Sequence, residues 1–128
     1  MKEQSRVYAT ILVYHDQLSS GAMVDLLEYE PSSTSNKGGE KNRKLSLCTY
    51  SSQYEVDSND LRNHLSFLII QLKDLLEKVK KGNEHGFECC ISVFWSSCPG
   101  HGGPVLSAKH MAFFGDLGIN IWFDYWND

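Results

Sequence analysis

Two kinds of hydrophobic periodicity alternate along the chain and divide it into strands and helices. Residues 7–14 read VYATILVY, a run of β-branched and aromatic residues that is typical of a strand. Residues 18–31 change to helical spacing, with Ser19 or Ser20 as the expected N-cap and Pro31 as the stop signal. The apolar positions of this predicted helix are Ala22, Met23, Leu26 and Leu27.

The middle of the chain contains a polar segment, a second strand region and the longest helix. Residues 32–44 mix Ser, Asn, Gly and Lys, which predicts a loop. Residues 44–56 (KLSLCTYSSQYEV) alternate well enough for one long strand or two short ones. A helix is predicted over about 59–81, with Ser58 as its cap and Gly82 after its end. Its apolar stripe consists of Leu61, Leu65, Leu68, Leu72, Leu75, Leu76 and Val79.

The last third of the chain repeats the change from strand to helix to strand. Residues 87–95 (FECCISVFW) predict a strand, and the following SSCPGHGG predicts a turn. Ser107 then caps a short helix that Gly118 closes, and residues 119–126 (INIWFDYW) predict the final strand. This order, without repeats or linkers, predicts one α+β domain over residues 1–128. We expect a mainly antiparallel sheet of about 4–6 strands with helices packed on one face.

Alternation along three of these strands assigns their side chains to two faces of the sheet. If the aliphatic set (for example Ile11, Ile91 and Ile121) faces the helices, the outer face is rich in aromatic groups. The outer set is Tyr8, Thr10, Tyr14, Ser92, Phe94, Trp122, Asp124 and Trp126. Such a mixture resembles the hot spots of protein interfaces. The alternatives are that the loop at 32–44 or a second copy of the chain covers this face, or that the face is simply half-buried.

Composition and charge narrow the classes of function. The 128 residues contain 41% hydrophobic and 12% aromatic residues, which is typical of a folded domain. The net charge of −4 argues against nucleic-acid binding and favours a basic partner. The N-terminal apolar run is too short for a signal peptide, and no segment approaches the roughly 18 apolar residues of a membrane span. We therefore expect a cytoplasmic protein with reduced cysteines.

The stretch ECCISVFWSSCPGHGGP is where the chain most resembles a chemical site, because it contains three of the four cysteines. Cys98 and His101 form a short pair, yet a structural zinc site normally needs a second such pair. For a cysteine nucleophile, nothing in the sequence positions a histidine base. No P-loop, dinucleotide fingerprint, Gly-x-Ser-x-Gly elbow or His-Glu-x-x-His motif is present. We therefore expect that the protein is not an enzyme and that it binds no cofactor and no metal.

Several short motifs resemble a bacterial family known as domain of unknown function 4279. The early match consists of Leu26, Leu27, Glu30, Pro31, Lys37 and Gly38. The late match consists of Leu106, Ser107, Leu117, Gly118, Ile119, Asp124 and Tyr125. The chain departs from the family pattern after the polar loop, where it reads LSLCTYSS instead of containing a Trp, and at Asn120, where the family has an aspartate. The resemblance covers nearly the whole chain and implies a cytosolic, non-enzymatic role. It also implies a relation to small acidic proteins that are encoded beside toxins as immunity proteins.

The resulting hypothesis is an immunity protein of a contact-dependent inhibition or polymorphic-toxin system. It would bind a cognate toxin domain, of nuclease type, and occlude its active site, while the protein itself is a monomer or homodimer that binds neither nucleic acid nor membrane. The candidate contacts are Trp122, Asp124, Trp126, Tyr54, Glu55, Glu84 and Glu88. The alternative hypothesis is a small ligand- or zinc-binding cytosolic module that uses the turn containing Cys98 and His101.

Overall fold

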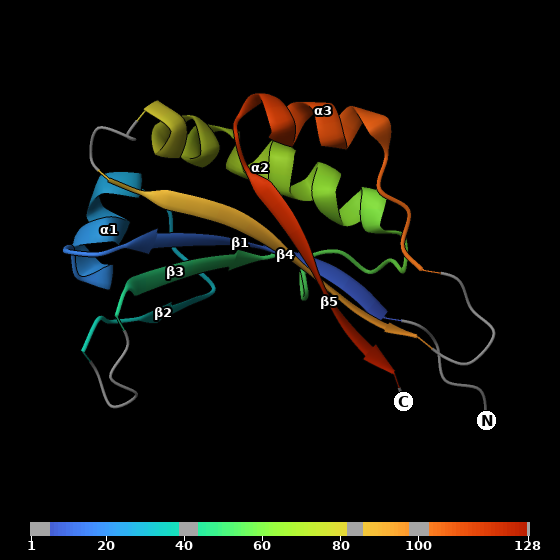
Figure 1. The fold of residues 1–128 in the computed structure, drawn as a ribbon, viewed down its shortest axis with the longest axis horizontal. Coiled ribbons are helices and arrows are strands. Elements are labelled where there is room, and N and C mark those ends of the chain that lie inside the picture. The colour runs from blue at the N-terminus through green and yellow to red at the C-terminus, as the bar shows by residue number, and fades with distance from the viewer. Residues whose placement is uncertain (1–5, 39–43, 82–85, 98–102, 128) are drawn as a thin grey trace.

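The computed structural model describes residues 6–38, 44–81, 86–97 and 103–127. Within these ranges, three helices and five strands follow one another (Figure 1). They are β1 (Arg6–His15), α1 (Ser20–Leu27), β2 (Ser33–Ser35), β3 (Ser46–Ser51), α2 (Leu61–Lys81), β4 (Glu88–Ser97), α3 (Ala108–Asp116) and β5 (Asn120–Asn127).

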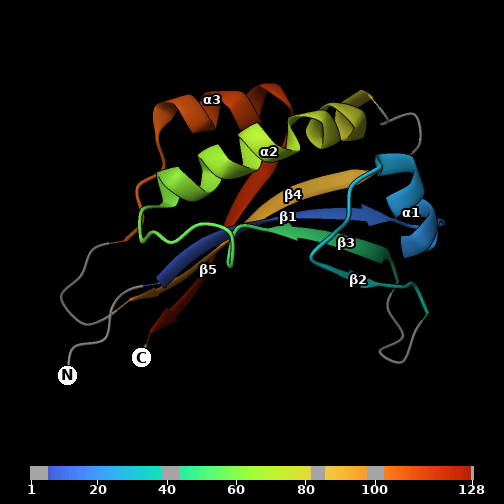
Figure 2. The ribbon, with the colours of Figure 1, turned by 180° about the vertical axis from the view of Figure 1, so that it is seen from behind.

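The strands form one sheet in the order β2-β3-β1-β4-β5, so the predicted α+β class is confirmed. Three of the four strand pairs are antiparallel, and β4 and β5 are parallel. A parallel pair needs a crossover connection, and α3 lies in the segment that connects these two strands. Figures 1 and 2 show α2 and α3 side by side on one face of the sheet, with α1 beside one end.

The core lies between the helices and the inward face of the sheet, as the alternation predicts. In β1, every second residue from Val7 to His15 is buried, and the residues between them are partly exposed. The same holds for Ile91 and Val93 of β4. Five leucines of α2 are almost completely buried against this face: Leu61, Leu65, Leu68, Leu75 and Leu76. Burying each such side chain stabilises the fold by about 1.5–3 kcal/mol.

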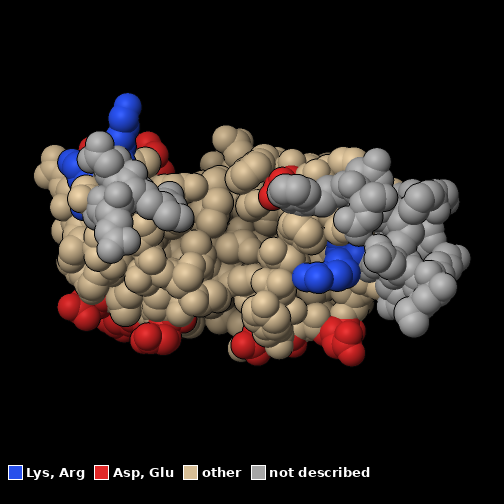
Figure 3. Space-filling view, turned by 90° about the horizontal axis from the view of Figure 1, so that it is seen from below, with Lys and Arg blue, Asp and Glu red and all other residues tan. Residues whose placement is uncertain are grey.

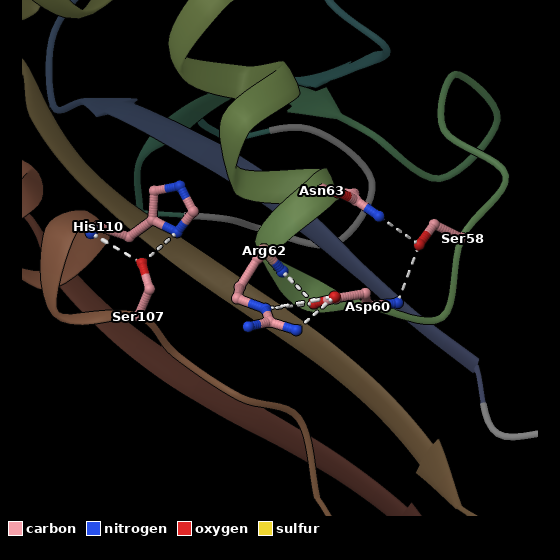
Figure 4. A network of polar contacts seen from close by, with 6 residues as sticks. All are labelled: Ser58, Asp60, Arg62, Asn63, Ser107 and His110. Carbon is pink, nitrogen blue, oxygen red and sulfur yellow. Dashed lines mark hydrogen bonds and ion pairs between the residues drawn. The ribbon is translucent and has the colours of Figure 1, made fainter.

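Local polar groups cap the helix ends. The C-terminal end of α1 and the N-terminal cap of α2 differ from the prediction. The helix α1 begins after Ser19, whose side chain accepts a hydrogen bond from the Ala22 N–H, and ends at Glu28 in the left-handed conformation. It therefore ends before Pro31. At α2, the Asp60 carboxylate rather than Ser58 accepts the Arg62 N–H of the first turn, at 3.0 Å (Figure 4). The Ser58 hydroxyl instead accepts the N–H of Asp60 itself.

The segment expected as a loop at 32–44 contains the three-residue strand β2. Ser33, Thr34 and Ser35 pair with β3 and extend the edge of the sheet. Their side chains are small and polar, so no hydrophobic pattern predicts a strand there. Pairing with a neighbouring strand is what makes this segment extended. The described part of the loop therefore lengthens the sheet and leaves its outer face open.

Candidate functional site

The outer face of the sheet, opposite the helices, divides into a hydroxyl half and an aromatic half. On β2 and β3 most outward side chains are small, and Leu47 is the exception. The Ser33 and Thr49 hydroxyls lie 2.6 Å apart. At the border with β1, Thr10 donates a hydrogen bond of 3.3 Å to Ser51. These hydroxyl groups bond with one another and present a polar surface. The aromatic side chains all lie toward β1, β4 and β5.

The aromatic half is built by cross-strand neighbours. Tyr8 of β1 and Phe94 of β4 are register partners, and their rings stack with centroids 4.9 Å apart. On the other side of Phe94 lies Asp124 of β5, and Trp122 occupies the next outward position of β5 with 50% of its surface exposed. Tyr54, from the turn after β3, is 90% exposed and lies close enough to Tyr8 to affect its ionisation. We call these five residues (Tyr8, Tyr54, Phe94, Trp122 and Asp124) the outer aromatic patch.

The electrostatics of the outer aromatic patch are mixed. Burial raises the pKa of Tyr8, the nearby Arg6 opposes this shift, and Tyr54 and Asp124 add to it. A shallow hollow of about 400 Å³ lies between Arg6, Tyr8, Tyr54 and Asp57. The hollow is thus bordered by aromatic rings together with one basic and one acidic group. This is the arrangement in which a partner side chain can be held by ring contact and charge together.

The space-filling view of this face shows a largely uncharged centre (Figure 3). Asp and Glu side chains gather along its lower edge in that view, and few Lys or Arg side chains are visible. A partner that covers the centre would desolvate few charges, while acidic groups at the rim would attract a basic surface.

The structure brings four of the seven predicted contacts together. Trp122, Asp124 and Tyr54 belong to the outer aromatic patch, and Glu55 is exposed beside Tyr54. Glu88 is also exposed on this face, but it pairs with Tyr14 at the opposite end of β4.

Phe94 lies six positions after Glu88, which corresponds to about 20 Å along a strand. The backbone of Trp126 pairs with Ser96, whereas its side chain and all of Glu84 lie outside the described part of the structure.

The described cysteines are residues of the sheet: Cys48 lies in β3, and Cys89 and Cys90 lie in β4. Cys48 is fully buried, and burial raises the pKa of its thiol. Burial raises the pKa of Cys89 to about 12. Cys90, on the outer face, has a pKa that burial raises and a hydrogen bond with Trp122 partly lowers. The raised pKa values keep these thiols mainly protonated at neutral pH, which lowers their reactivity.

Among the described residues, no group of three or more His, Cys, Asp and Glu side chains could hold a metal ion. Cys98 and His101, the pair on which the zinc hypothesis depends, lie outside the described residues. The alternative hypothesis of a ligand- or zinc-binding turn therefore stays a prediction.

A serine–histidine contact that the sequence did not indicate lies in the core. The Ser52 hydroxyl is 2.7 Å from Nδ1 of His64, and His64 Nε2 is 2.7 Å from the Ser58 carbonyl. Since a carbonyl only accepts, His64 donates through Nε2. The Ser52 hydroxyl donates to the Ala9 carbonyl at 3.1 Å. Ser52 in turn accepts the Ala9 N–H. With Ser52 and His64 almost completely buried, this pair ties β1, the end of β3 and α2 together and cannot reach a substrate.

A second histidine links α2 and α3. The Ser107 hydroxyl caps α3 and lies 2.9 Å from Nδ1 of His110, while Nε2 of His110 lies 3.1 Å from Ser66 of α2 (Figure 4 shows the Ser107 contact). Burial, with a smaller effect of Lys109, lowers the pKa of His110. His110 borders a groove of about 480 Å³ that is also lined by Ile69, Ile70 and Phe113. The neutral ring joins the two helices at the base of this groove.

The described residues thus form a two-layer α+β domain in which one sheet face bears an aromatic patch and is covered by none of the described helices. Residues 5–128 match the family model described as Domain of unknown function (DUF4279), so the chain belongs to this family. Neither a curated protein nor a solved structure gives a significant match to the chain. Within the described ranges, no helix is long and apolar enough to cross a membrane.

Proposed function

We propose that this protein is an immunity protein, which binds a toxin domain through the outer aromatic patch and occludes the active site of that toxin. The observation that carries the proposal is the open sheet face, where aromatic side chains surround Asp124 and where none of the described helices lies (Figure 2). A protein of this size seldom leaves a group of aromatic side chains uncovered unless a partner uses it.

The exposed aromatic residues supply the affinity in this proposal. Trp122 and Tyr54 present half or more of their surfaces to solvent, and both residue types are enriched among interface hot spots. Phe94 and Tyr8 hold each other in place by stacking, so little side-chain entropy is lost when a partner covers them. The patch is therefore pre-organised for binding.

The acidic groups favour a basic partner. Asp124 lies within the patch, Glu55 and Asp57 follow Tyr54, and the whole chain has a net charge of −4. A nuclease fits this requirement, because the groove that holds nucleic-acid phosphates is lined by Lys and Arg. An acidic protein is steered onto such a groove and competes with the nucleic acid for it.

Co-expression tests the proposal. The C-terminal domain of the protein encoded immediately upstream is induced in a bacterial host, with and without this chain. We expect growth arrest without the chain, and rescue together with co-purification when it is present. If the upstream domain arrests growth and the chain does not rescue it, the immunity proposal for that pair is wrong.

A variant pair then locates the binding surface. The double change Tyr54→Ala and Trp122→Ala removes two exposed rings of the patch and should abolish rescue. The control is Ile70→Ala, which removes a side chain of α2 that is 72% exposed in the helical layer. Equal rescue by both variants would mean that the toxin binds elsewhere on the protein.

A further inference from the structure

The two edges of the sheet differ in a way that points to how a partner binds. The edge strand β2 has three residues, whereas β5, at the other edge, has eight. Natural proteins protect edge strands by shortening them or by placing Lys, Pro or a bulge in them, because unpaired N–H and C=O groups accept a further strand. The sequence of β5 is NIWFDYWN, without Lys, Arg or Pro. Only the β2 edge is protected by its length.

The side chains of β5 are exposed on both faces of the sheet. Trp122 on the outer face is 50% exposed, and Phe123 and Tyr125 on the helical face are 46% and 49% exposed. Tyr125 contacts Trp95 of β4, with ring centroids 4.4 Å apart. In Figure 1, α3 lies above the beginning of β5, and the later part of the strand extends away from the helices. An added strand would therefore find apolar contacts above and below its backbone.

Charge decides between a second copy of this chain and a different partner. Residues 116–128 contain three aspartates and no Lys or Arg. Asp124 is the one charged residue of β5, so a second copy that paired its own β5 with this edge would bring a second Asp124 alongside, and like charges across a strand pair are destabilising. A basic strand would instead be attracted to it.

We infer that β5 accepts a basic, extended segment of the partner protein as a sixth strand of the sheet. This inference rests on the proposed function, because it describes how the same partner engages the protein beside the outer aromatic patch. Main-chain hydrogen bonds to β5 supply register and affinity, and Trp122 and Phe123 contact alternate side chains of the added strand.

Amide exchange of the full-length, isotope-labelled protein tests this inference without a toxin. The probe is an octapeptide of alternating lysine and valine, and its control alternates glutamate and valine. In a strand, the N–H groups of successive residues point to opposite edges, so only alternate β5 amides are free. At a peptide concentration about ten times its Kd, exchange of these amides should slow about tenfold.

The outcomes separate this inference from the proposed function. Protection of alternate β5 amides by the lysine peptide alone supports the inference. Absence of β5 protection, or equal protection by the glutamate peptide, overturns it, even if the upstream toxin domain is neutralised. A concentration-dependent dimer that protects β5 without peptide also overturns it, since a second copy then occupies the edge. Failed rescue with intact peptide binding rejects only the toxin proposal.

Two kinds of variant control for folding. Of Phe123→Pro and Asp124→Pro, one removes an N–H bonded to β4 and the other removes an N–H at the free edge. The variant that keeps the wild-type melting temperature is the edge variant, and it should bind the lysine peptide at least about tenfold more weakly. Phe123→Lys places a positive charge at a half-exposed position and should weaken binding of the same peptide. Wild-type affinity in both variants overturns the inference.

Discussion

The ring of Tyr8 lies almost parallel to the ring of Phe94, at 19° between planes, across the pairing of β1 with β4. This stack forms the centre of the outer aromatic patch, between Tyr54 on one side and Asp124 on the other. Because Tyr8 and Phe94 are more than eighty positions apart in the chain, the stack forms only when the middle of the sheet is correctly paired.

Truncation of Phe94 is expected to loosen both the sheet and the patch. Phe94→Ala should lower the free energy of unfolding by about 1–2 kcal/mol, because the stack and part of its buried area are lost. Denaturant unfolding measures the change. Phe94→Tyr keeps an aromatic ring at this position and should remain within about 0.5 kcal/mol of the wild type. An equal loss in both variants would mean that stacking does not account for the effect.

The Trp122 side chain should contribute to binding and little to folding. Trp122→Ala is expected to weaken the affinity for the toxin domain by about 2–4 kcal/mol, as measured by titration calorimetry. The free energy of unfolding should change by less than about 1 kcal/mol, because half of the side chain is already exposed. A large stability loss with unchanged affinity would assign Trp122 to the fold instead.

The buried Ser52–His64 pair should be a strong determinant of stability. Ser52→Ala leaves His64 Nδ1 and the Ala9 N–H without their partner inside the protein, at a cost of about 1–3 kcal/mol. Ser33→Ala is the matched control, since it breaks an exposed hydroxyl contact of 2.6 Å at the edge of the sheet. That control should change the free energy of unfolding by no more than about 0.5 kcal/mol.

The lowered pKa of His110 predicts an acid-sensitive link between α2 and α3. Its pKa in the folded protein lies below the ordinary value of 6.5, so the unfolded chain binds the proton more readily. The contribution of His110 to the free energy of unfolding is therefore complete above about pH 6.5 and is lost as the pH falls toward the lowered pKa.

Unfolding experiments between pH 7 and pH 5 measure this effect. We expect the free energy of unfolding of the wild type to decrease over this range, and that of His110→Gln to decrease less. Lys109→Ala removes the neighbouring positive charge and so raises the folded-state pKa of His110 toward its ordinary value. The decrease in the free energy of unfolding toward pH 5 should then be slightly smaller than in the wild type. Identical pH dependence in wild type and His110→Gln would contradict the assignment.

The three described thiols should differ in reactivity. In a Cys98→Ser background at pH 8, iodoacetamide should modify the folded protein at Cys90 before Cys48 or Cys89. Cys90 is partly exposed on the outer face, whereas Cys48 is fully buried and the pKa of Cys89 is raised to about 12. Tandem mass spectrometry distinguishes the adjacent Cys89 and Cys90. Faster modification of Cys89 would contradict the placement of its side chain on the helical face.

Much of the secondary structure could be predicted because its signals are local. The alternation in residues 7–14 predicted which side chains of β1 are buried, and Ser107 and Gly118 marked the two ends of α3. The strand β2 could not be predicted, since Ser33, Thr34 and Ser35 carry no hydrophobic pattern and become extended only by pairing with β3. The start of α2 differed because both Ser58 and Asp60 could serve as its cap. The helix α1 ended before Pro31 because Glu28 adopts the left-handed conformation.

Individual residues of the candidate site could be predicted from the sequence, but their contacts with one another could not. Trp122 and Asp124 were placed on the outer face by parity, and the structure agrees. Nothing in the sequence indicated that Tyr54 lies beside Tyr8, that Glu88 is at the opposite end of the strand, or that Ser52 meets His64 in the core. Each of these relationships depends on how separate elements are arranged in the fold, which the pattern within one element does not indicate.

The sequence by itself determined the family, the fold class and the inward and outward faces of most strands, because periodicities of 2 and 3.6 residues act within single elements. The tertiary structure alone decided the strand order, the parallel pairing of β5 with β4, and hence which edge and which aromatic groups are left open. The physical reason is that strand pairing is chosen by the total burial and hydrogen bonding of the whole sheet. The pattern of a single segment therefore does not predict which strands pair.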